Sequence, residues 1–158
     1  MIVIAVVPIT VTVVRAGKGD EMTGTILCCV SGGAHARKAA ELAVELARKL
    51  GRELCFLLVN QTRPASGHPP IKALTEDRAR EILDISLRYA QVHGVAAARS
   101  ALVEARDVAA AILDFAAGAG VDHIVVGTGN PPFLGRLLLG SVSEAVVAGA
   151  KCSVTVAR

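Results

Sequence analysis

Aromatic residues are scarce in this chain. Its 158 residues hold no Trp, one Tyr and three Phe, whereas hydrophobic residues make up 53% of the total. The core must therefore be built from Val, Leu, Ile and Ala packed in regular secondary structure, which is typical of an α/β domain. A chain of this length buries about two-thirds of its unfolded surface without disulfides or metals, so we expect a single domain.

An excess of one charge sign is also lacking. The formal net charge is +3, and Lys and Arg alternate with Asp and Glu along the chain. Domains that bind nucleic acid usually carry a basic patch or stripe that contacts the phosphate backbone. The sequence therefore predicts no nucleic-acid partner.

Cysteine is limited to four residues, and none has the spacing of a metal site. Cys28, Cys29, Cys55 and Cys152 all lie in apolar runs, with no CxxC pair and no His at ligand spacing. Cys28 and Cys29 are neighbours on a predicted strand, so their side chains should point to opposite faces and form no disulfide with each other. We expect reduced, buried thiols in a cytoplasmic protein without a bound metal.

The apolar run at residues 1–14 is too short to span a bilayer. It also lacks the charged start and clear cleavage site of a secretory signal, so we expect no membrane association. Pro8 divides the run into two strand-like halves, which suits an added edge strand or an arm that contacts a partner. The alternative is that Met22 is the natural start. Either way, residues 1–21 form an extension and residues 22–158 form the domain.

From residue 25 onward, strand-like and helix-like segments alternate. Apolar β-branched runs predict strands, and apolar residues spaced three to four apart predict helices. Gly51 and Gly94 supply helix stops, Asp107 is placed as an N-cap, and a loop rich in Pro, Gly and Ser precedes the second helix. The predicted strands are 25–30, 53–60, 96–103, 121–127 and 152–157, and the predicted helices are 35–50, 75–93, 108–117 and 141–148.

This alternation predicts an α/β fold, in which a single-domain, open, five-stranded parallel sheet of Rossmann-like type carries helices on both faces. Ligands of such sheets bind beyond the carboxyl ends of the strands, where the winding direction reverses. If the first and fourth strands are central neighbours, the turns SGGA (31–34) and GTGN (127–130) face the same crevice.

A glycine-rich stretch, GTGNPPFLGRLLLGSVSEA, begins at the end of the fourth strand and spans residues 127–145. Gly127 and Gly140 lack a Cβ, so the backbone can pass close to a ligand at both positions. Ser141 opens a helix whose free N–H groups and positive dipole end attract anions. The stretch therefore suits a phosphate group. The structural alternative is a capping box, in which Ser141 and Glu144 each satisfy the other's backbone N–H.

These elements resemble a universal stress protein domain over residues 24–158. The resemblance rests on the helix HARKAAELAVELARKLG, the helix DVAAAILDFA before VDHIVVG, and the tail LGRLLLGSVSEAVV before CSVTVA. ATP-binding members of this family carry Gly, two residues, Gly, nine residues, then Gly-Ser or Gly-Thr, and Gly127, Gly140 and Ser141 match that pattern. The resemblance implies an adenine nucleotide between the first and fourth strands and a homodimer formed through the final strand.

Two positions depart from the family pattern. Asn130 replaces the second Gly, and Pro131 pushes the residue before it into extended backbone, so Gly129 is expected to supply the positive φ. Ser31 stands where ATP-binding members carry an Asp that helps to hold ribose or adenine. The resemblance places the backbone contact to adenine at Val59, and the Arg136 cation could reach phosphate. The expected nucleotide-binding residues are Val30, Ser31, Val59, Val126, Gly127, Gly129, Asn130, Arg136, Gly140, Ser141, Val142 and Ser143.

The predicted function is a stress-response regulatory module that binds ATP and signals through conformation or dimerisation. One alternative is a family member that binds no nucleotide and acts through its dimer or partner surface, and another is a slow ATPase. No Asp/Glu pair near the loop is placed to hold Mg²⁺, and we assign no catalytic residue. SGGAHA does not match the GxGxxG fingerprint of dinucleotide enzymes. His35 is expected at the solvated surface, and the other histidines, His68, His93 and His123, form no metal-spacing cluster.

Overall fold

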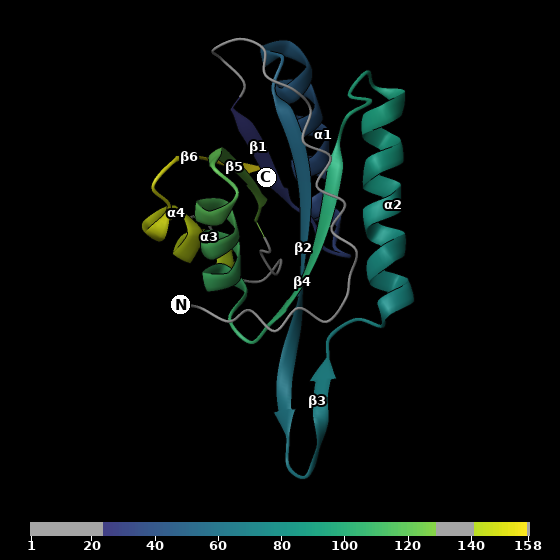
Figure 1. Cartoon of the computed structure of the whole chain (residues 1–158), viewed down its shortest axis with the longest axis vertical. Coiled ribbons are helices and arrows are strands. Elements are labelled where there is room, and N and C mark those ends of the chain that lie inside the picture. The colour runs from purple at the N-terminus through teal and green to yellow at the C-terminus, as the bar shows by residue number, and fades with distance from the viewer. Residues whose placement is uncertain (1–23, 129–140, 158) are drawn as a thin grey trace.

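The computed structural model describes residues 24–128 and 141–157, and within them an α/β fold is observed (Figure 1). Five strands run parallel in the order β4-β2-β1-β5-β6, and β3 pairs antiparallel with β2. The predicted fold class is confirmed, and the first and fourth predicted strands, now β1 and β5, are paired neighbours, which is the condition on which the predicted crevice depended. In chain order the elements are β1 (Thr25–Cys29), α1 (Ala34–Leu50), β2 (Glu53–Ala65), β3 (His68–Lys72), α2 (Glu76–Val92), β4 (Arg99–Ala105), α3 (Val108–Gly118), β5 (Val121–Gly127), α4 (Ser141–Gly149) and β6 (Ser153–Ala157).

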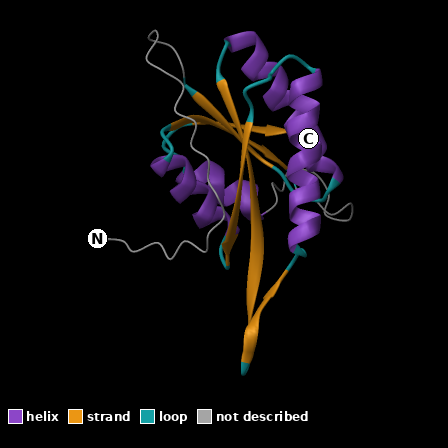
Figure 2. Ribbon diagram, turned by 45° about the vertical axis from the view of Figure 1, so that its right-hand side comes forward, coloured by secondary structure: helices purple, strands orange, loops and turns teal. Residues whose placement is uncertain are grey.

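Helices cover both faces of the sheet, as Figure 2 shows. Alternating strand residues point to opposite sides. Ile26 and Phe56 pack with α1 and α2 on one face. Leu27 and Leu57 pack with α3 and α4 on the other. The neighbours Cys28 and Cys29 follow the same alternation, so the predicted separation of their thiols is confirmed, and the structure places all four cysteines as free thiols.

The helix boundaries follow local signals in the sequence. Gly51 adopts a left-handed φ of 62° after α1, and Gly94 has a φ of 89° after α2, a conformation that glycine adopts without steric cost. The Asp107 carboxylate accepts a hydrogen bond from the Ala110 N–H at 3.0 Å and thereby caps α3. No helix among the described residues is long and apolar enough to cross a membrane.

The predicted loop between the second strand and the second helix is wrong. The strand β2 continues to Ala65, and β3 returns beside it after a turn at residues 66–67, so that an antiparallel ribbon projects from the body (Figure 1). We call residues 61–72 the β2–β3 arm. Its prolines indicated a loop in the sequence, but a ribbon edge tolerates proline because not every N–H is needed for pairing. Pro64 lies where the register of the pairing shifts, between Arg63 and Ala65.

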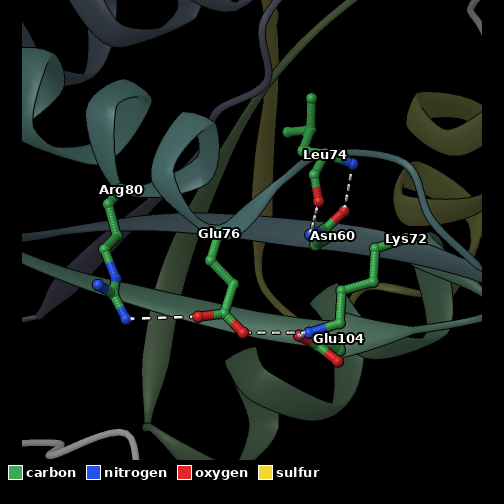
Figure 3. Close-up of polar contacts among 6 residues, drawn as sticks. All are labelled: Asn60, Lys72, Leu74, Glu76, Arg80 and Glu104. Carbon is green, nitrogen blue, oxygen red and sulfur yellow. Dashed lines mark hydrogen bonds and ion pairs between the residues drawn. The ribbon is translucent and has the colours of Figure 1, made fainter.

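Polar contacts of two side chains, Asn60 and Lys72, fix the base of this arm (Figure 3). The amide side chain of Asn60, which is 1% exposed, donates to the Leu74 carbonyl and accepts from the Leu74 N–H, both at 2.9 Å. The Lys72 ammonium lies 2.6 Å from a carboxylate oxygen of Glu104 and 3.4 Å from one of Glu76. Hydrogen bonding to Glu104 raises the pKa of Lys72, so the ion pair holds a protonated lysine. These contacts therefore hold the base of the arm in a fixed position relative to the sheet and α2.

Candidate functional site

A pocket lies at the carboxyl ends of the central strands, where the predicted crevice was expected. Its volume is about 290 Å³, and residues from β1, β2, β5, α1, α3 and α4 line it. The crevice exists because β1 and β5 are parallel neighbours, and the chain leaves them toward α1 on one face of the sheet and toward α4 on the other. A second hollow of similar volume lies along α2, and all of its lining residues within the described part of the chain belong to that helix.

Seven of the twelve expected nucleotide-binding residues line the pocket at the central strands. They are Val30, Ser31, Val59, Val126, Gly127, Val142 and Ser143. Ser141 is the first residue of α4, and its side chain, with the expected capping box to Glu144, lies outside what the structure describes. The remaining four, Gly129, Asn130, Arg136 and Gly140, lie outside the described residues.

The walls of the pocket are apolar. Leu57 and Val59 come from β2, Val108 and Ile112 from α3, and Val126 from β5. Such walls suit a flat, apolar group such as a nucleobase. Cys29 also lines the pocket, and burial, followed by the nearby Cys55, raises the pKa of its thiol to about 12. The thiol therefore stays neutral at physiological pH and adds no charge to the wall.

Few polar side chains reach the pocket. The Ser31 hydroxyl accepts a hydrogen bond from the Gly33 N–H at 3.4 Å and so closes the turn after β1. Ser143 is 2% exposed at the first turn of α4. Within the described lining, no Asp, Glu, Lys or Arg is present. Likewise, no group of three His, Cys, Asp or Glu side chains in the described ranges could hold a metal ion.

Helix starts point their backbone N–H groups toward this end of the sheet. The helix α1 begins at Ala34 after Gly33, which has no side chain to cap it, and α4 begins at Ser141. The first N–H groups of a helix lack intrahelical partners and carry the positive end of its dipole. Both helices contribute residues to the pocket lining, so an anionic group at the mouth would find favourable electrostatics without a cationic side chain.

Gly127 is required for a reason that differs from the predicted one. A Cβ at this position would lie 2.6 Å from the His35 carbonyl oxygen and 2.9 Å from the His35 carbonyl carbon. Contacts that short do not occur for real side chains, so the end of β5 must be glycine to let the backbone of α1 approach. The expected close approach to a ligand stays a prediction, whereas the close approach to α1 is observed.

The sequence predicts a solvated surface position for His35, and this prediction is wrong. It lines the pocket, is only partly exposed, and its Nδ1 atom is buried without a hydrogen-bond partner in the described structure. The spacing of residues in α1 could have revealed this position. His35 precedes the fully buried Ala39 and Ala43 by four and eight residues, so it continues the core-facing stripe of the helix beyond the edge of the sheet.

Comparisons with a family model and with known proteins both find similarity to universal stress proteins. The sequence model described as the universal stress protein family matches residues 22–158. The protein named "Universal stress protein in QAH/OAS sulfhydrylase 3'region", from Thermus aquaticus, is 34% identical over 140 residues, which cover 87% of this chain and 100% of that relative.

Solved structures share the fold. A universal stress protein in complex with cAMP has a TM-score of 0.67 and 21% identity, covering 85% of this chain and 96% of its own. The universal stress protein from Archaeoglobus fulgidus in complex with dAMP has a TM-score of 0.66 and 20% identity, covering 87% of this chain and 98% of its own. The similarity to both extends over most of the chain.

Proposed function

Because the chain belongs to the universal stress protein family, we propose that it is a regulatory module that binds ATP in the pocket between β1 and β5. The observation that carries the proposal is the convergence of seven residues, expected from the sequence to contact a nucleotide, around one pocket. Two proteins of similar structure bind adenine nucleotides, because one was solved in complex with cAMP and the other with dAMP. The cytoplasm, where the four thiols remain reduced, is the proposed location.

Different parts of the pocket suit the base and the phosphates of a nucleotide. The adenine ring would lie against the apolar walls, with the backbone at Val59 available to its polar edge. The volume of about 290 Å³ is at the lower end of ligand pockets, which span roughly 300–1,000 Å³, so the base and ribose would be enclosed. The phosphates would extend toward the start of α4, where backbone N–H groups favour anions.

Thermal unfolding with nucleotides tests this proposal. A ligand present at a hundred times its Kd stabilises the folded state by about 2.7 kcal/mol. For a chain of this size that corresponds to a rise of roughly 5–10 °C in Tm. We expect such a rise with ATP, and a smaller rise with GTP because the proposed site selects adenine. Val59→Trp, which fills the pocket, should abolish the rise, whereas Val92→Trp, on the 82% exposed residue of α2, should preserve it.

The same preparations separate the alternatives. An unchanged Tm at millimolar ATP, AMP and cAMP would contradict nucleotide binding and leave a family member that acts through its surfaces. Steady release of phosphate from ATP would instead support a slow ATPase. We propose a non-catalytic role because the described lining offers no carboxylate to hold Mg²⁺.

We propose that the partner of the chain is a second copy of itself, paired through β6. This strand pairs with β5 along one side, and in the described structure no strand covers its other side. Val154 and Val156 are only partly buried. A free strand edge with apolar residues is prone to pair with another chain. The proposed dimer would extend the sheet across two copies.

A matched pair of charge substitutions tests this dimer. Ser153→Lys places a cation on the edge strand β6, and Ser100→Lys places the same cation on β4, the edge strand at the opposite side of the parallel sheet. Both serines are exposed. Because like charges across an interface cost several kcal/mol, we expect Ser153→Lys to raise the dimer Kd at least about tenfold in sedimentation equilibrium. A monomeric parent protein, or an equal effect of the two variants, would refute pairing through β6.

A further inference from the structure

His35 carries the only ionisable side chain with a nitrogen or oxygen atom in the described lining of the pocket. Its backbone is held in place, because the His35 carbonyl packs against the Gly127 backbone at a distance that excludes even a methyl group. The residue lies in the first turn of α1, on the stripe that leads down to Ala39 in the core. The imidazole is therefore positioned at the pocket by the fold itself.

The Nδ1 atom of His35 lacks a hydrogen bond within residues 24–128 and 141–157. It is buried and has no partner among the described residues. A buried polar atom without a partner costs roughly 1–3 kcal/mol relative to one that is hydrogen-bonded. Such an atom at the wall of a ligand pocket is expected to gain its partner from the ligand, since binding then removes the cost.

Neither the Ser31 hydroxyl nor the apolar walls provide a described hydrogen-bond partner for the His35 Nδ1 atom. The Ser31 hydroxyl closes its own turn by accepting from Gly33. The walls from β2, β5 and α3 are apolar. A ligand group that pairs with Nδ1 must suit an imidazole in either tautomer, and a hydroxyl does so because it both donates and accepts. In a nucleotide, the ribose supplies such hydroxyl groups.

We infer that His35 recognises the sugar of the bound nucleotide through a hydrogen bond between its Nδ1 atom and a ribose hydroxyl. This inference rests on the proposed nucleotide-binding function and extends it to a specificity: the site distinguishes ribonucleotides from deoxynucleotides. It also assigns a binding role to a residue that stands outside the expected nucleotide-binding set.

The test combines protein variants with altered ligands. Calorimetry would give the Kd of AMP, 2′-deoxy-AMP and 3′-deoxy-AMP for the wild type, His35→Ala and His35→Asn. The asparagine amide lies close to the position of Nδ1, so His35→Asn should retain most of the affinity for AMP. We expect His35→Ala to bind AMP about tenfold more weakly, which corresponds to one net hydrogen bond. For the deoxynucleotide that lacks the paired hydroxyl, His35→Ala and wild type should bind equally. His68→Ala, in the exposed arm, is the matched control.

Unliganded stability supplies an independent readout. Because His35→Ala removes an unpaired buried nitrogen, its Tm without ligand should equal or exceed that of the wild type, whereas a purely structural histidine would lower Tm when removed. Equal AMP binding by His35→Ala and wild type would overturn the inference while leaving the proposed function intact. Equal losses with all three nucleotides would overturn the assignment to ribose. A wild-type protein that binds none of the three would overturn the inference, and the proposed function would fall with it only if ATP also failed to bind.

Discussion

Gly127→Ala is expected to lower the free energy of unfolding by about 2–4 kcal/mol, as overpacking against an immobile neighbour does. The added methyl group would lie 2.6 Å from the His35 carbonyl oxygen and 3.3 Å from the Ala36 nitrogen. These are backbone atoms of α1, so no side chain can rotate away, and the helix must shift as a unit. That helix packs on β1 and β5 across the buried core of one face of the sheet.

Urea unfolding followed by circular dichroism measures this loss. Gly118→Ala is the matched control, because a Cβ there meets no atom within 4 Å and the residue lies in α3. Alanine is favoured over glycine in a helix, so the control should be neutral or stabilised by up to about 1 kcal/mol. An equal response of the two variants would show that Gly127 does not mediate a close approach of α1 to β5. Nucleotide affinity should fall as well, because α1 forms part of the pocket.

Asn60→Ala is expected to cost about 2–4 kcal/mol, which is large for a single polar residue. The substitution removes both hydrogen bonds to Leu74 and leaves its N–H and carbonyl without their partner where the chain turns from the arm into α2. Asn60 itself is 1% exposed, so the alanine also leaves a cavity at the carboxyl end of β2. The effect should be strongest in the β2–β3 arm, whose base loses its anchor.

Hydrogen exchange in the arm distinguishes this account from a general loss of stability. Amides of β2 and β3 within residues 61–72 should exchange faster in Asn60→Ala than expected from its global stability. Asn60→Asp should behave similarly, because a carboxylate accepts from the Leu74 N–H but cannot donate to its carbonyl. Gln61→Ala is the control, since it removes a single exposed hydrogen bond of 3.3 Å to the Arg106 carbonyl. Unchanged protection in the arm would contradict the anchoring role of Asn60.

The central architecture could be predicted because its signals are local. Apolar strands, capped helices and glycine stops each depend on a few adjacent residues, as at Asp107 and Gly51. The parallel direction of the main strands, though not their order, followed from the alternation of strands and helices. By contrast, β3 was missed because its prolines favour a loop, and pairing with β2 depends on residues across the turn, such as Arg63 opposite Ile71.

The part of the site formed by strand ends could be predicted from the sequence. Strand ends such as Val30 and Val126 could be assigned to a crevice once β1 and β5 were taken as neighbours. His35 and Gly127 could not be paired from the sequence, because their contact depends on how closely α1 packs on the sheet. A three-dimensional distance of this kind has no signature in spacing alone.

The β2–β3 arm has a practical consequence for measuring ligand binding. Its turn at residues 66–67 is exposed and projects beyond the body of the protein (Figure 1), while the same strand carries Val59 in the pocket wall. Exposed turns tolerate inserted sequence because few contacts are broken there. A fluorophore attached at Ser66 would be linked to the pocket by a short, continuous strand without occupying the pocket or the β6 edge. The arm thus offers an attachment point for an optical sensor built from this chain.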